Sequence, residues 1–76
     1  MNIFCERFRD LRKNMNLSQK QLADILKTNN SSICDWERGR SQPDLETLAR
    51  AACFFDVTAD YLLGLEDETG AKVKLF

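Results

Sequence analysis

Histidine is absent from the sequence, and cysteine is scarce and unpaired. Without histidine, a Ser-His-Asp triad, a Cys-His pair and any zinc site with a histidine ligand are excluded. Cys5, Cys34 and Cys53 form no C-x-x-C pair, so we expect no metal site and no structural disulfide, as is typical of a reducing compartment. The sequence also lacks a glycine-rich phosphate loop and paired carboxylates beside a nucleophile. We therefore expect a protein that is not an enzyme and carries no cofactor.

Long hydrophobic runs are missing as well. The longest uncharged apolar stretch, residues 51–55, is far shorter than the roughly 20 residues that span a bilayer. Charged residues at positions 6, 7, 9 and 10 interrupt the region where a signal peptide is apolar. With 43% hydrophobic residues, three glycines and one proline in 76 residues, the composition predicts one small globular domain. We expect it to be soluble and cytoplasmic, with no membrane partner and no small-molecule ligand.

The charges are unevenly distributed along the chain. The net charge of −1 and the isoelectric point near 5.3 argue weakly against binding to nucleic acid. However, residues 1–43 carry eight lysines and arginines against five acidic residues, whereas residues 44–76 carry three against seven. A chain with one basic half can bind a polyanion while its acidic half faces away.

Apolar residues recur at helical spacing through most of the chain and predict an all-α fold. A first helix carries a stripe formed by Phe4, Phe8, Leu11 and Met15. Ser18 and Gln21 form a Ser-x-x-Gln capping box that begins a second helix. The residues of this second helix that are available for burial are Leu22, Ala23, Ile25 and Leu26.

The third predicted helix follows a short turn, begins at the N-cap Asn29 and stops at Gly39. Ile33 and Trp36 share one face of this helix and are expected in the core. The opposite face carries Ser31, Cys34, Asp35 and Arg38.

Two further helices are predicted in the second half of the chain. A helix capped by Asp44 carries apolar residues at helical spacing, and a short helix runs from the cap Thr58 to Gly64. The apolar residues of the first of these are Leu45, Leu48, Ala49, Ala52 and Phe55. Cys5 and Cys53 are expected to be packing residues.

Two short helices joined by a three-residue turn form a helix-turn-helix pattern. The motifs around it are Leu17-Ser18-Gln19-x-x-Leu22-Ala23, Ser31-x-Ile33-x-x-Trp36-Glu37-Arg38-Gly39-Arg40-Ser41-x-Pro43, Leu45-Glu46-Thr47-Leu48 and Val57-Thr58-x-Asp60-Tyr61-Leu62-Leu63-Gly64. In this order and spacing, over roughly residues 6–64, they resemble the Cro/CI-type (XRE-like) helix-turn-helix family. The resemblance implies a compact five-helix, lambda-repressor-like bundle over residues 1–64, with its third helix in the major groove of DNA.

The resemblance also implies which residues contact double-stranded DNA. Base contacts are implied for Asn30, Ser31 and Asp35, which can meet an adenine edge, several bases and a cytosine amino group, respectively. Cys34, on the same face, either touches a thymine methyl group or makes no contact. The implied phosphate contacts are Gln19, Asn29, Arg38 and Arg40. In the alternative interpretation, Asn29, Asn30 and Ser31 only cap and solvate a surface helix.

Four positions, Arg12, Lys27, Asp35 and Glu37, bear further on the resemblance. Arg12 and Glu37 match a family pair that ties the first helix to the end of the third; the alternative is two unrelated surface charges. Lys27 replaces a usual turn glycine, and a left-handed backbone there costs about 1 kcal/mol for a residue with a side chain. Asp35 repels phosphate unless it meets a cytosine amino group. We therefore expect a modest, strongly salt-dependent affinity for DNA.

These features favour a sequence-specific transcriptional regulator, a repressor that binds an inverted-repeat operator as a homodimer. The second region, residues 65–76, is expected to be either a dimerisation segment or a disordered tail, and residues 72–75 alternate as in a short strand or a frayed terminus. The candidate dimer residues are Tyr61, Leu65 and Val73–Phe76. The alternative function is a protein-interaction module, adaptor-like or antitoxin-like, which the acidic second half favours.

Overall fold

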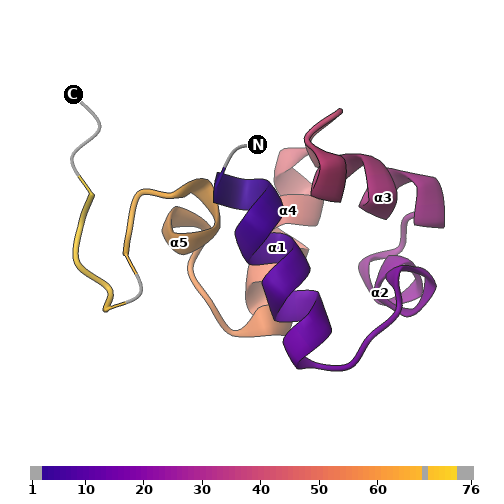
Figure 1. Cartoon of the computed structure of the whole chain (residues 1–76), viewed down its shortest axis with the longest axis horizontal. Helices are drawn as coiled ribbons and strands as arrows, with labels where there is room; N and C mark the ends of the chain where they lie inside the picture. The colour runs from indigo at the N-terminus through magenta and orange to yellow at the C-terminus, as the bar shows by residue number, and fades with distance from the viewer. Residues whose placement is uncertain (1–2, 68, 74–76) are drawn as a thin grey trace.

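The computed structural model of the chain describes residues 3–67 and 69–73, and these form five α-helices (Figure 1). The helices are α1 (Ile3–Asn14), α2 (Gln19–Leu26), α3 (Asn30–Arg38), α4 (Leu45–Phe55) and α5 (Ala59–Leu63). The described residues contain no strand, so the all-α five-helix fold expected from the sequence is confirmed. In Figure 1, α1 crosses the middle of the molecule, with α2 and α3 on one side and α5 on the other. Within the described ranges, no helix is both long enough and apolar enough to cross a membrane.

Side-chain caps determine where the later helices begin. At α2, Ser18 Oγ accepts a hydrogen bond from the Gln21 N–H at 3.0 Å, and Gln21 Oε1 accepts one from the Ser18 N–H at 2.8 Å. This contact completes the predicted capping box. The remaining three helices begin at Asn29, Asp44 and Thr58. Each of these side chains accepts a hydrogen bond from a backbone N–H that the first helical turn leaves unpaired.

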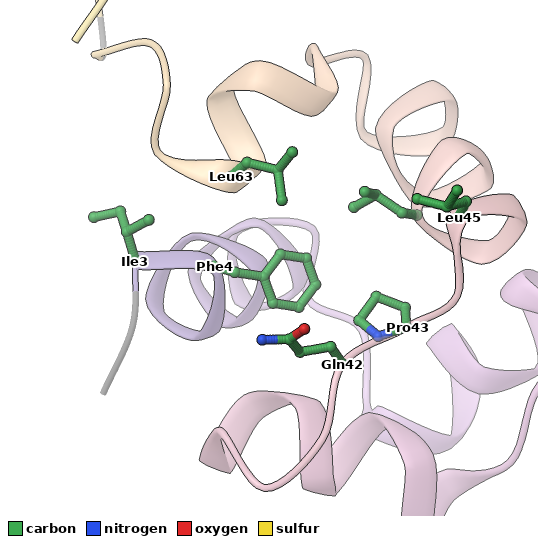
Figure 2. A pocket seen from close by; sticks show the side chains of 7 residues that line it. Ile3, Phe4, Gln42, Pro43, Leu45 and Leu63 are labelled. Atoms are coloured by element: carbon green, nitrogen blue, oxygen red, sulfur yellow. The ribbon is translucent and has the colours of Figure 1, made fainter. Parts of the chain in front are cut away.

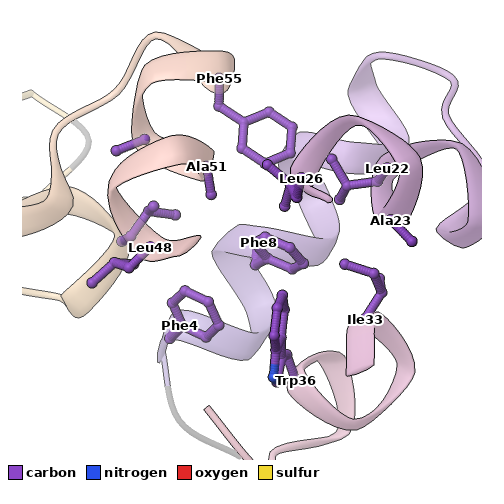
Figure 3. Close-up of a cluster of buried hydrophobic side chains, with 12 residues drawn as sticks. Phe4, Phe8, Leu22, Ala23, Leu26, Ile33, Trp36, Leu48, Ala51 and Phe55 are labelled. Carbon is purple, nitrogen blue, oxygen red and sulfur yellow. The ribbon is translucent and has the colours of Figure 1, made fainter. Parts of the chain in front are cut away.

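Phe8 lies at the centre of a core to which all five helices contribute (Figure 3). Its ring centroid is 5.2 Å from that of Phe4, 6.0 Å from that of Trp36 and 5.8 Å from that of Phe55. The contacts with Trp36 and Phe55 are edge-on, a favourable geometry for aromatic pairs. Ile33 and Trp36 are buried as expected, which fixes one face of α3 against the bundle.

Two side chains expected in the core stripes are exposed because they lie at or beyond an end of their helix. Met15 follows the end of α1, in the turn before α2, where helical spacing no longer determines which side is buried. Leu45 is the first residue of α4 and is 85% exposed, since this helix reaches the core only at Thr47 and Leu48.

Other corrections arise from the rotation of side chains around a helix. Cys53 is exposed, contrary to the packing role expected for it, because it lies about 100° around α4 from the buried Ala52. For the same reason Ile25 of α2 and Ala49 of α4 face solvent. Cys5 is buried in α1, as expected.

The segment after α5 turns back on itself at the edge of the molecule farthest from α2 and α3 (Figure 1). Glu66 and Lys72 form an isolated antiparallel bridge, and the Val73 N–H donates to the Leu65 carbonyl at 2.8 Å. Of residues 72–75, which alternate as in a short strand or a frayed terminus, the described ones form this single bridge and no strand. Lys74–Phe76, the rest of the candidate dimer segment, lie outside the described residues.

Arg7 fastens this segment to α1. Its Nη1 donates hydrogen bonds to the backbone carbonyls of Tyr61 and Glu66, the latter at 2.6 Å. Its guanidinium carbon lies 4.1 Å from the centroid of the Tyr61 ring, a cation–π arrangement. Tyr61 is consequently half-buried within its own chain.

Candidate nucleic-acid interface

α2 and α3 pack against each other across the three-residue turn 27–29. Lys27 has φ 59° and ψ 44°, and its N–H is directed at the carbonyls of Ala23 and Asp24, which closes α2. Lys27 thus adopts the left-handed backbone that the usual turn glycine would favour. A lysine there costs about 1 kcal/mol relative to glycine. The turn nevertheless leads directly into the extended backbone of Asn29, from which α3 begins.

The outer face of α3 carries the residues expected to contact bases. Asn30 and Ser31 are exposed at the start of the helix, and Cys34 and Asp35 are half-buried one turn later. Ser31, Cys34 and Asp35 lie on the side of α3 away from the buried Ile33 and Trp36, whereas Asn30 is exposed because it is the first residue of the helix. The helix therefore presents amide, hydroxyl, thiol and carboxylate groups from a surface that its apolar face holds rigidly in place.

Asn29 is the N-cap of α3. Its Oδ1 accepts a hydrogen bond from the Ser32 N–H at 2.8 Å, so its side chain caps α3. The capping part of the alternative interpretation therefore applies to Asn29. Asn30 and Ser31 lie beyond the cap, with exposed side chains.

Glu37 joins three parts of the chain through hydrogen bonds. Its carboxylate accepts from Arg12 Nε at 2.7 Å and Arg12 Nη2 at 3.0 Å, and it also accepts from Gln19 Nε2 at 3.2 Å. Arg12 Nη1 donates in addition to the Leu17 carbonyl at 2.8 Å. The side chains of Arg12 and Glu37 are only 11% and 4% exposed. The hydrogen bond with Glu37 raises the pKa of Arg12 above its ordinary value.

Sequence reasoning missed the contact between Gln19 and Glu37. Gln19 stands at the start of α2, where the resemblance implies a phosphate contact, and the structure directs its amide nitrogen toward Glu37. A signal was present in the sequence, since Glu37 is four residues from Ile33 and therefore on the core side of α3. A buried carboxylate needs donors around it.

The basic residues expected to contact phosphate lie at the end of α3. Arg38 and Arg40 are both exposed, one in the last turn of the helix and one in the loop that follows it. Arg40 Nη1 lies 3.9 Å from Asp35 Oδ1, a weak ion pair because solvent reaches both side chains, which are 64% and 43% exposed. The one acidic side chain on this face is thus next to a basic one.

Comparison with known proteins identifies this arrangement of helices. A family model described as helix-turn-helix matches residues 8–62. The chain is 38% identical over 72 residues to the HTH-type transcriptional regulator YobD of Bacillus subtilis (strain 168). The aligned region covers 95% of this chain and 64% of the relative. It is 41% identical over 64 residues to the HTH-type transcriptional activator BcrR of Enterococcus faecalis, covering 84% of this chain and 31% of the relative.

Solved structures of similar fold also belong to regulators of transcription. The P22 c2 repressor protein, in a crystal structure with a synthetic operator, is similar with a TM-score of 0.78 and 30% identity, over 83% of this chain and 96% of that chain. A transcriptional regulator from Listeria innocua gives a TM-score of 0.78 at 31% identity, over 86% and 61% of the two chains.

The chain spans less than two thirds of the length of the two curated relatives described above. The matches nevertheless cover the two helices and the turn that carry the polar face of α3. They fall among transcription regulators and not in an enzyme class. With its fold, its motifs and these matches in agreement, the chain belongs to the Cro/CI-type (XRE-like) helix-turn-helix family.

Proposed function

We propose that the chain is a sequence-specific DNA-binding regulator of transcription, which inserts α3 into the major groove and binds an inverted-repeat operator as a homodimer. The observation that carries the proposal is the exposed polar face of α3, held in place by the buried Ile33 and Trp36. A helix of this width fits the major groove, where each base pair presents a distinct pattern of donors and acceptors. A function on chromosomal DNA would place the chain in the cytoplasm.

Asn30 and Ser31 are proposed as the main base-reading residues. An asparagine amide can pair with both groups of an adenine edge, and a serine hydroxyl can donate to or accept from several bases. Asp35 is proposed to accept from a cytosine amino group, with Cys34 beside it against a thymine methyl group. Because Asp35 also repels phosphate, it acts by excluding wrong sequences more than by adding affinity.

Four side chains around α3 are proposed to position it on the backbone of the DNA. Arg38 and Arg40 are exposed and positively charged, which suits phosphate contacts. Gln19 and Asn29 lie at the starts of α2 and α3, where helix N-termini attract anions. Asn29 already uses its side-chain oxygen as a cap, so its contribution is proposed to come from the other side of its amide and from the helix end.

Repression is the proposed direction of regulation, because a dimer bound across an operator excludes other proteins from that DNA. The P22 c2 protein is named a repressor and BcrR an activator, so the family accommodates both directions. Placing the selected site between a promoter and a reporter gene tests the direction. Lower reporter output with the wild type than with Asn30→Ala supports repression, whereas higher output assigns activation.

Selection of preferred sites from a random duplex pool at moderate salt tests the function itself. The Asn30→Ala variant removes one proposed base contact from an exposed position, and Asn14→Ala is the matched control at the exposed end of α1. We expect an enriched inverted repeat with the wild type and with Asn14→Ala, and loss or broadening of one position in each half-site with Asn30→Ala.

The opposite result points to the alternative function. Weak, salt-sensitive binding without any enriched sequence contradicts the proposal and favours a protein-interaction module. Arg40→Ala combined with Gln19→Ala separates the two further, because loss of all DNA binding in this variant supports the proposed phosphate contacts.

A further inference from the structure

A shallow apolar groove lies between the start of α1, the start of α4 and the end of α5 (Figure 2). Its volume is about 320 Å³. Ile3, Pro43, Leu45 and Leu63 border it, with Gln42 as the polar member. None of the side chains that line the groove is charged.

The exposed apolar residues of the described chain concentrate at this groove. Six large hydrophobic side chains are exposed, and three of them, Ile3, Leu45 and Leu63, border the groove. The others are dispersed over the turn before α2, the outer side of α2 and the C-terminal segment. Clustered apolar side chains on a surface are typical of a contact with another molecule, whereas single ones are ordinary.

We infer that this groove is the surface through which a second copy of the chain docks, an inference that rests on the proposed function. A two-fold interface brings the same patch to both sides, so a charged patch would meet its own charge. An uncharged apolar patch has no such conflict. The amide of Gln42 carries both donors and an acceptor, so it can pair with its counterpart in the second copy.

The position of the groove fits two DNA half-sites. The loop after α3 runs from the exposed Arg40 to Gln42 and Pro43 at the groove, so docking here brings the ends of both copies of α3 toward the two-fold axis. Half-sites lie about 34–36 Å apart. The molecule measures 34 × 23 × 21 Å, so two copies on neighbouring half-sites are close enough to touch across the surface between them.

Tyr61 and Leu65, two of the other candidate dimer residues, are half-buried within their own chain. Tyr61 lies under the Arg7 guanidinium, and the Leu65 carbonyl accepts a hydrogen bond from the Val73 N–H. Leu45, in contrast, is 85% exposed and Leu63 is 48% exposed. In the described part of the segment after α5, only Val73 is an exposed large apolar side chain, at 38%, so the groove offers more uncovered apolar surface.

Sedimentation equilibrium over a concentration series tests the inference with the whole chain. The variant Leu45→Glu places a charge in the groove, and Met15→Glu is the control at an exposed apolar residue elsewhere. A glutamate in the first turn of α4 suits the helix dipole, so the fold is expected to persist, which circular dichroism checks. We expect the wild type and Met15→Glu to dimerise, and Leu45→Glu to dimerise about tenfold more weakly or worse.

A second measurement uses duplexes with one or two copies of the selected half-site. We expect the wild type and Met15→Glu to fill two half-sites cooperatively, and Leu45→Glu to fill them independently with unchanged affinity for a single half-site. Equal dimerisation and cooperativity of Leu45→Glu and the wild type overturns the inference. A wild type that is monomeric throughout and fills two half-sites independently overturns it as well, while leaving the proposed DNA binding intact.

The two proposals fail in different ways. If no duplex is bound in preference to others, the proposed function is contradicted. Sedimentation equilibrium alone then tests whether the groove is the dimer surface. A dimer that is lost in Leu45→Glu and kept in Met15→Glu supports the groove even in that case.

Discussion

Glu37 is the one charged residue that is buried among the described parts of the chain, and its carboxylate has three hydrogen bonds from two side chains. Burying a carboxylate is unfavourable unless donors replace the water it loses. Arg12 supplies the counter-charge from α1, and Gln19 supplies an amide from α2. One residue of α3 therefore determines how three helices meet beside the proposed DNA-binding face.

Replacing Glu37 by alanine is expected to lower the free energy of unfolding by about 3 kcal/mol, because breaking a buried pair leaves the Arg12 charge without its partner. Urea denaturation measures the change. Glu46→Ala is the control, since Glu46 pairs with Arg50 at 2.7 Å on the exposed surface of α4, where such pairs contribute about 0–1 kcal/mol. A Glu37→Ala effect as small as that of the control would mean that the pair contributes no more than a surface pair.

Asp35→Ala is expected to raise non-specific DNA binding and to lower discrimination at one base pair. The substitution removes a charge that repels phosphate and releases Arg40 from its 3.9 Å ion pair. Binding to the selected site and to single-base variants, each over a salt series, measures both effects. Unchanged affinity together with unchanged sequence preference would show that Asp35 does not lie at the interface.

Among the helical elements, the end of α2 is formed by Lys27 in a left-handed backbone conformation. Lys27→Gly is expected to raise the free energy of unfolding by up to about 1 kcal/mol, because glycine adopts the left-handed backbone of this turn without the steric cost of a side chain. Urea denaturation checks the sign. The matched Lys20→Gly, inside α2, is expected to lower stability by about 1 kcal/mol. If Lys27→Gly destabilises as well, the turn is not strained by its lysine.

The N-cap of α4 makes stability depend on pH. Hydrogen bonds from Thr47 hold the pKa of the Asp44 carboxyl below its ordinary value of 3.8. Because the pKa is lower in the folded state, this contribution is fully present above pH 3.8 and is lost as the pH falls through the folded pKa.

Asp44→Asn keeps a capping oxygen and removes the titration, so its unfolding free energy is expected to fall less steeply than that of the wild type below pH 3.8. Urea denaturation at a series of acidic pH values measures the slope. Asp24→Asn, at an exposed position inside α2 that caps no helix, is expected to follow the wild type. Identical slopes for Asp44→Asn and the wild type would contradict the assignment.

At the scale of the whole molecule, truncation after Leu65 separates the C-terminal segment from the bundle. It removes the Glu66 carbonyl that accepts from Arg7 but keeps the Tyr61 carbonyl and the buried Leu62. Three exposed contacts are lost as well, from Val73 N–H to the Leu65 carbonyl, from Thr58 to the Glu66 carboxylate and from Lys72 to Asp60. We expect all five helices to remain, with a loss of about 1–3 kcal/mol in stability for these contacts together. If the groove forms the dimer, the oligomeric state is unchanged; a truncated chain that becomes monomeric would assign the interface to the removed segment. Circular dichroism and sedimentation equilibrium distinguish these results.

The helices could be predicted from the sequence because their starts are local events. Ser18 and Gln21, like Asp44 and Thr47, are three residues apart, so the cap is visible in the chain itself. Periodicity was less reliable for burial, since Leu45 and Cys53 lie in a helix as predicted but face solvent. A short helix in a small bundle buries only a narrow face, and its exact rotation depends on packing.

The long-range polar contacts could not be predicted in the same way. Gln19 and Glu37 are 18 positions apart, and Arg7 is 54 and 59 positions from the carbonyls that it holds. Only the packed bundle brings these groups within hydrogen-bond distance. The family resemblance supplied the Arg12–Glu37 pair and the proposed DNA contacts, which helical spacing alone does not contain.

The central place of Phe8 has a consequence for how the chain folds as it is synthesised. Two of the rings that surround it, Trp36 and Phe55, belong to helices made after α1, and α1 also contacts α5. On the ribosome, α1 therefore emerges with an apolar face that α3 can cover only in part and that stays incompletely covered until α4 and α5 are made. Of the five helices, α1 is made first and is among the last to be enclosed. Until then, this aromatic stripe is exposed apolar surface of the kind that promotes aggregation of nascent chains.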